Sequence, residues 1–107
     1  MTAPIVRIKL YDVPDVEACV RAIRHEVRGL ASRCSALTAV LFGLACDGGQ
    51  YEAHVDVHFP RHQIIVNAAA PTTERAVHEA MEKIATELRR LEARDASVAT
   101  PLQAKAA

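Results

Sequence analysis

Residues 37–69, LTAVLFGLACDGGQYEAHVDVHFPRHQIIVNAA, decide the fold, because they place two turn signals between three segments that can form strands. Segment 37–46 is short, uncharged and nearly all apolar, so its periodicity alone does not distinguish a strand from a buried helix. The sequence Asp47-Gly48-Gly49 that follows is typical of a tight turn, which favours a strand entering a hairpin.

The segment after this turn alternates strictly between apolar and polar residues. One face carries Tyr51, Ala53, Val55, Val57 and Phe59, and the other carries Glu52, His54, Asp56 and His58. This period of two indicates a strand with one buried face. Pro60-Arg61-His62 predicts a second turn, and residues 63–69 predict a further strand with Ile64 and Val66 inward. The three strands form an antiparallel meander.

The residues before the meander predict a strand and then a helix. Val6, Ile8 and Leu10 alternate with Arg7, Lys9 and Tyr11, which indicates a strand with one buried face. Asp15 is suited to cap a helix over residues 15–34. Its apolar stripe, at a spacing of 3.6 residues, consists of Val16, Cys19, Val20, Ile23, Val27, Leu30, Ala31 and Cys34.

A second helix follows the meander. Thr72 and Thr73 offer capping hydroxyls, and the helical pattern then continues to about Arg94. Its apolar stripe consists of Val77, Ala80, Met81, Ile84, Leu88 and Leu91. The predicted order is β-α-β-β-β-α, an α+β fold in which a four-stranded sheet carries both helices on one face. We expect a single domain over residues 1–95 and a flexible tail over residues 96–107.

Length and charge limit the possible functions. The chain has 107 residues, and its 13 basic residues balance 13 acidic residues. A neutral chain is not a simple polycation, so any nucleic-acid role must come from the arrangement of charges. No segment reaches the ~18 apolar residues of a membrane span. Three cysteines, an odd number, favour reduced thiols and a cytoplasmic protein over a disulfide framework.

The order of elements and several local patterns resemble the ribosome hibernation factors. This family includes hibernation promoting factor and the ribosome-associated inhibitor, also called ribosomal subunit interface protein or sigma-54 modulation protein. The similarity covers residues 5–94, and the order of elements carries more of it than the local patterns. The local patterns are Asp15-Val16-Glu17-Ala18, Val27-Arg28-Gly29-Leu30, Ala76-Val77-His78, Lys83-Ile84 and Glu87-Leu88.

The resemblance implies a non-enzymatic inhibitor of translation. Such a protein binds the small ribosomal subunit and its rRNA in the channel used by messenger and transfer RNA, during starvation or stationary phase. The chain is similar to the short form of the family. The resemblance implies no cofactor, and we expect a monomer or a weak homodimer.

Two rows of basic residues are candidates for RNA binding. On the first helix Arg21, Arg24 and Arg28 share one face, and Arg33 lies near the end. On the second, the basic residues within an arc of roughly 100° are Arg75, Lys83, Arg90 and Arg94. Rows on neighbouring helices would form a groove whose guanidinium groups match phosphate oxygens.

The same charges also suit an ordinary exposed helix. Glu17 with Arg21, and Glu79 with Lys83, have the i, i+4 spacing that stabilises a surface helix by ~0.3 kcal/mol per pair. Residues 72–95 contain five basic and six acidic residues, a net charge of −1. The second helix of the family is usually clearly basic, so this helix departs from its pattern.

The polar face of the central alternating strand supports an alternative hypothesis. His54, Asp56 and His58 share that face at successive spacings of ~6.8 Å, and His62 is near them in sequence. Histidines at alternating strand positions can bind zinc if other ligands join them. A hydrated outer face is the simpler interpretation. The alternative function is a small metal-binding or regulatory domain that uses this face for a ligand or for dimerisation.

No set of residues in the sequence is typical of a catalytic site. Cys46 lies next to a turn, but no histidine is tied to it by a recognisable motif. Gly48-Gly49 lacks the strand-glycine-helix context of a phosphate-binding loop.

Overall fold

The computed structural model describes residues 3–94 and confirms the predicted order of elements. The strands and helices are β1 (Ile5–Tyr11), α1 (Val16–Arg33), β2 (Ala39–Asp47), β3 (Gln50–His58), β4 (Gln63–Ala70) and α2 (Thr73–Arg94). Segment 37–46, for which periodicity left two possibilities, forms most of β2. The predicted tail over residues 96–107 lies outside the described residues.

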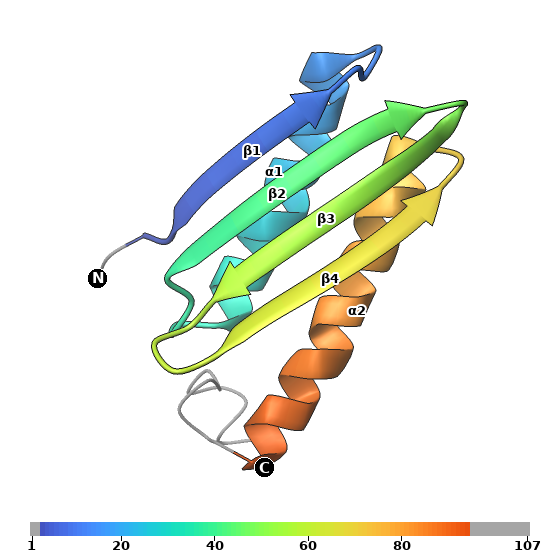
Figure 1. Cartoon of the computed structure of the whole chain (residues 1–107). Helices are drawn as coiled ribbons and strands as arrows, with labels where there is room; N and C mark the ends of the chain where they lie inside the picture. The colour runs from blue at the N-terminus through green and yellow to red at the C-terminus, as the bar shows by residue number, and fades with distance from the viewer. Residues whose placement is uncertain (1–2, 95–107) are drawn as a thin grey trace.

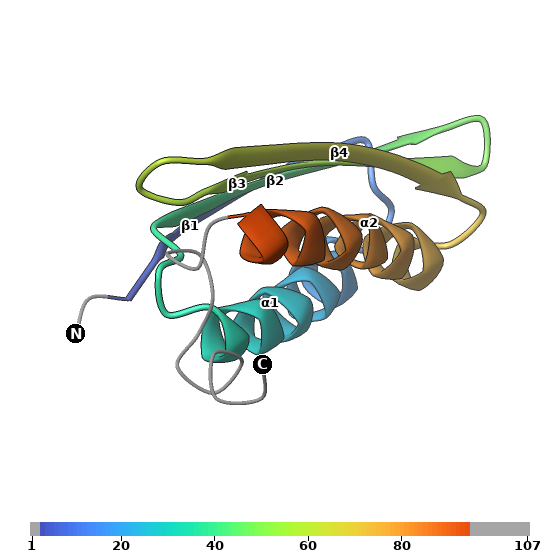
Figure 2. The same ribbon diagram turned by 90° about the horizontal axis from the view of Figure 1, so that it is seen from below.

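The four strands form one mixed sheet in the order β1-β2-β3-β4 (Figure 1). β1 pairs in parallel with β2, and the β2-β3 and β3-β4 pairs are antiparallel. Both helices cover the same face of the sheet and start at the same end of it (Figure 2). This arrangement confirms the α+β fold, and no element within residues 3–94 covers the opposite face of the sheet.

Local side-chain and backbone chemistry fixes the ends of these elements. The Asp15 carboxylate accepts a hydrogen bond of 3.0 Å from the Ala18 amide, as expected for a helix N-cap. The Thr72 hydroxyl oxygen accepts one of 3.2 Å from the Arg75 amide at the start of α2. Gly48 and Gly49 have φ angles of +59° and +79°. Two successive left-handed residues suit a turn whose twist matches a β-hairpin, and glycine adopts them without steric cost.

The core lies between the sheet and the two helices. On the apolar face predicted for the central strand, Ala53, Val55, Val57 and Phe59 are buried, and Tyr51 is half-buried. Ile64 and Val66 of β4 are buried as predicted. From β2 and the helices, the most deeply buried side chains include Phe42, Leu44, Val40, Ile23, Leu30, Val77 and Ile84. Because the chain has no Trp and only two Phe, aliphatic residues supply almost all of this packing.

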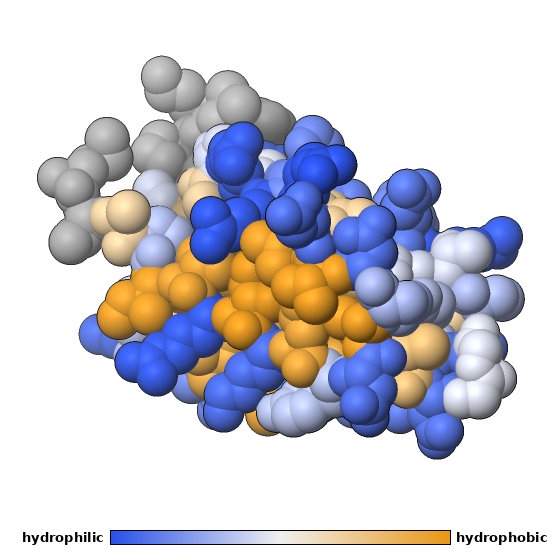
Figure 3. Space-filling view, turned by 90° about the horizontal axis from the view of Figure 1, so that it is seen from above, coloured by the Kyte–Doolittle hydropathy of each residue, from blue (hydrophilic) through white to orange (hydrophobic). Residues whose placement is uncertain are grey.

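Strand β1 differs from the prediction that one of its faces is buried. Val6 is 40% exposed, and Ile8 and Leu10 are half-buried. Val16, placed in the apolar stripe of the first helix, is 54% exposed. The reason is that β1 is an edge strand, and a groove of about 790 Å³ separates it from α1. Figure 3 shows the resulting hydrophobic patch, which is bordered by hydrophilic side chains.

Neither of the two helices in the described range is both long and apolar enough to cross a membrane.

Candidate nucleic-acid interface

The α1 row has the properties of a cationic binding surface. Arg21, Arg24 and Arg28 are exposed, and none of them forms an ion pair with another residue of the range 3–94. Their charge is therefore not offset by a direct carboxylate partner in that range. Guanidinium groups in this state are available for bidentate bonds to phosphate.

The three arginines lie along two different depressions. Arg21 lines a hollow of about 660 Å³ between α1 and α2. Arg24 and Arg28 line the apolar groove between α1 and β1. The row therefore forms a ridge between these depressions, and its cations can reach ligands on either side.

Contrary to the prediction, the basic residues of α2 do not form a row that faces the α1 arginines. Arg75 lines the hollow between the helices, but Lys83 lies over the opposite flank of α2, where its ammonium group donates to the backbone oxygen of Asn67 on β4. Arg90 is paired with Glu87 at 2.9 Å. The expected common groove, with one basic row on each side, is therefore not formed. The physical reason is that the sequence gives only the angle of a residue around its own helix. It does not say which neighbouring helix or strand that residue faces, and part of the predicted arc of α2 faces β4.

Acidic groups lie in and beside the hollow between the helices, and one of them makes a contact between α1 and α2 that the sequence did not predict. His78 lies 2.6 Å from the carboxylate of Glu82 and 3.9 Å from that of Glu26 on α1. Glu74 also lines this hollow, and Arg75 approaches Glu79 at 3.9 Å. These contacts reduce the positive charge that Arg21 and Arg75 bring. No spacing within the sequence could have shown the Glu26-His78 contact, because it joins two helices.

The ends of the two helices hold the remaining predicted basic residues. Arg33 and Arg94 are exposed and occupy the last turns of α1 and α2. Cys34 caps the C-terminus of α1, and burial, reinforced by the negative charge of Glu92, raises the pKa of its thiol from 9.0 to about 11. At neutral pH this thiol is protonated.

The three candidate metal ligands on β3 lie beside other polar side chains. His54 Nδ1 lies 2.6 Å from Asn67 Oδ1, and His58 Nε2 lies 3.1 Å from Asp56 Oδ1. The Gln63 amide donates to both oxygens of Asp56, at 2.8 and 3.0 Å. Across residues 3–94, no three His, Cys, Asp or Glu side chains come together as a possible set of metal ligands. The metal-binding alternative therefore receives no support from this geometry.

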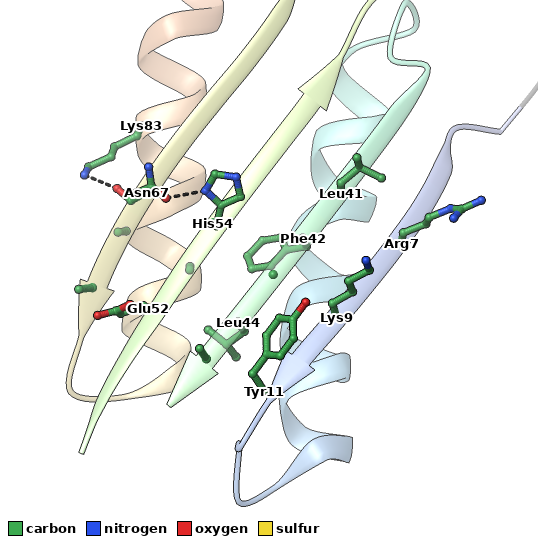
Figure 4. Close-up of a pocket in the computed structure, with 15 residues that line it drawn as sticks. Arg7, Lys9, Tyr11, Leu41, Phe42, Leu44, Glu52, His54, Asn67 and Lys83 are labelled. Atoms are coloured by element: carbon green, nitrogen blue, oxygen red, sulfur yellow. Dashed lines mark hydrogen bonds between the residues drawn. The ribbon is translucent and has the colours of Figure 1, made fainter. Parts of the chain in front are cut away.

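The outer face of the sheet carries a hollow that sequence reasoning did not identify. It has a volume of about 890 Å³, and Figure 4 shows it above β2, with Lys9 and Tyr11 on the β1 side and His54 and Glu52 on the β3 side. The only signal in the sequence was Gly43, a residue without a side chain in the middle of an apolar strand.

The comparisons with known proteins identify the fold. The sequence matches no model of a protein family, and it matches no curated protein. Solved structures do match. A ribosomal subunit interface protein from Coxiella burnetii is similar with a TM-score of 0.73 and 15% identity, over 82% of this chain and 97% of that one. The N-terminal domain of Protein Y from Thermus thermophilus is similar with a TM-score of 0.71 and 15% identity, over 82% and 98%. The fold expected from the resemblance is thereby confirmed.

Proposed function

We propose that this chain is a ribosome-associated hibernation factor of the short type. In this proposal it binds the rRNA of the small subunit within the channel for messenger and transfer RNA, and it inhibits translation by occupying that channel. It acts in the cytoplasm, without a cofactor, under conditions in which protein synthesis is reduced. The observation that carries the proposal is the set of exposed arginines Arg21, Arg24 and Arg28, in a fold shared with a ribosomal subunit interface protein.

The unequal charge of the two helices indicates which one makes the principal contacts with rRNA. Residues 15–34 contain four arginines and three acidic residues, a net charge of +1, whereas residues 72–95 have a net charge of −1. The cations of α1 lack acidic partners in the described range, whereas Arg75 and Arg90 of α2 have glutamates beside them. We therefore assign the principal phosphate contacts to α1. Arg33, Arg75, Lys83, Arg90 and Arg94 make secondary contacts.

A charge-reversal variant tests the proposal. Replacing Arg21, Arg24 and Arg28 together by Glu should abolish co-sedimentation with ribosomes and with isolated small subunits, because phosphate would then face carboxylates. The triple Lys variant keeps the charge and should retain most of the binding. Circular dichroism checks that α1 remains folded in both variants.

A second control addresses the opposite face of the molecule. The double variant His54→Gln/His58→Gln should bind ribosomes like the wild type, because both residues alternate with the buried residues of β3 and so lie on the sheet face away from the helices. The proposal fails if the wild-type protein stays at the top of the gradient even at low salt. It also fails if the Glu variant pellets as well as the wild type does.

A further inference from the structure

The outer face of the sheet is ordered in rows that cross all four strands. The strand register aligns Lys9, Gly43, His54 and Asn67 in one row. The next row contains Tyr11, Ala45, Glu52 and Ala69. In both rows β2 contributes a residue with little or no side chain, between longer side chains on β1 and β3. A trough therefore runs along β2.

Gly43 is not required by the backbone at this point. Its φ angle is not in the left-handed region, and a Cβ atom placed there would meet its nearest neighbours, the backbone oxygen and Cβ of His54, at 3.7 and 4.0 Å. Both distances are ordinary van der Waals contacts, so the Cβ atom of an alanine would fit. Glycine weakens a strand interior, and it often marks a place where another group approaches the backbone closely.

The rim of the trough is positively charged and carries an aromatic ring. Arg7, Lys9 and Lys83 bring three cations and Glu52 brings one carboxylate, a net charge of +2 if histidine is neutral. Tyr11, at the β1 side, is 54% exposed. The rim therefore matches a ligand that is anionic at one end and aromatic at the other.

Polar groups on the far side of the trough are available for a specific contact. The Oδ1 atom of Asn67 bonds to His54, but no residue in the range 3–94 accepts a bond from its Nδ2 group. Glu52 is exposed on the same side and forms no ion pair within that range. An amide donor and a carboxylate acceptor are the groups that pair with the polar edge of a nucleobase.

We propose that this trough binds a nucleotide. The base lies on the Ala45 floor, between Tyr11 and Glu52, which stand two strands and so roughly 10 Å apart. The phosphate contacts Lys9 and Arg7, and Glu52 accepts a hydrogen bond from an exocyclic amine. The ligand is a free mononucleotide or one nucleotide of a single RNA strand. The contacts named here, with Lys9, Arg7 and Glu52, come from β1 and β3 and are not among those assigned to the ribosome, so this site stands or fails independently of the ribosome proposal.

Titration of the ¹⁵N-labelled protein, followed by NMR, tests this site. 5′-AMP should give saturable shifts centred on Lys9, Gly43 and Asn67, and 5′-UMP, which lacks an exocyclic amine, should bind more weakly. If the tetranucleotide AAAA gave saturable shifts of these residues and 5′-AMP gave none, the result would support the site with an RNA strand as its ligand. The proposal is overturned if inorganic phosphate gives the same shifts as 5′-AMP, or if no probe shifts these residues.

Two variants locate the site. Gly43→Val fills the trough, and it should weaken 5′-AMP binding by about tenfold or more, the scale of losing one base-stacking contact. The matched control Gly29→Ala changes an exposed glycine of α1 and should leave binding unchanged. A thermal unfolding curve for each variant establishes that it is folded. Binding of 5′-AMP to Gly43→Val with wild-type affinity would overturn the assignment.

Discussion

At the scale of single residues, the environment of a side chain decides its chemistry more than its type does. Arg28 and Arg90 are both exposed helix arginines, but Arg90 has a glutamate at 2.9 Å and Arg28 has no acidic partner among residues 3–94. The three cysteines differ in how far they are buried. Cys19 and Cys34 are buried, whereas Cys46, next to the turn at Gly48-Gly49, is half-buried.

The buried thiol of Cys34 should make stability depend on pH. Its pKa is about 11 in the folded protein and near 9 when it is unfolded. Above pH 9 the unfolded chain loses this proton first, so the free energy of unfolding falls between pH 9 and 11, and the contribution is fully present below pH 9. Urea unfolding of the wild type and of Cys34→Ala across this range measures it. Parallel pH curves for the two proteins would contradict the prediction.

At the scale of secondary structure, short polar signals determine where each element begins. Asp15 starts α1, Thr72 starts α2, and two glycines with positive φ make the hairpin between β2 and β3. Each of these signals is local in the sequence. The boundaries of the helices and strands were therefore predicted closely, including the end of α2 at Arg94.

Removal of the α1 cap should destabilise the protein moderately. Asp15→Ala loses the hydrogen bond to the Ala18 amide and should lower the free energy of unfolding by about 1 kcal/mol. Asp15→Asn keeps an acceptor at this position and should restore most of the loss. Chemical denaturation measures all three proteins, and an alanine variant as stable as the wild type would show that this cap is not needed.

At the scale of the whole molecule, the arrangement of charge matters more than its sum. The chain is neutral, but the three α1 arginines without acidic partners in the described range lie on the helix side, and the outer face of the sheet has a cationic rim of its own. The edge strand β1 adds an exposed apolar groove that Arg24 and Arg28 border. One neutral domain thus presents surfaces of different chemistry.

The small number of α1 arginines predicts a modest dependence of ribosome binding on salt. If the three α1 arginines make the main phosphate contacts, the logarithm of the binding constant should fall against the logarithm of salt concentration with a slope of about −2 to −3. Sedimentation at several potassium chloride concentrations gives this slope. A slope near zero would exclude phosphate contacts as the main interaction. A slope near that of a strongly basic protein would show that many more cations take part.

The sequence by itself determined the order of elements, their ends and the buried face of the meander. These features depend on neighbours along the chain: alternation in Ala53, Val55 and Val57, helical spacing in α1 and α2, and the turn at Gly48-Gly49. The exposure of all eight predicted RNA-binding residues followed from the same periodicity.

Only the tertiary structure decided which residues of different helices and strands face one another. It placed Lys83 against β4 instead of in a groove with Arg21, brought Glu26 to His78, and left one face of β1 partly open. It also aligned Lys9, Gly43 and His54 into one row across three strands. The physical reason is that periodicity fixes the angle of a side chain about its own helix or strand. Packing then fixes how the elements are rotated and registered against one another.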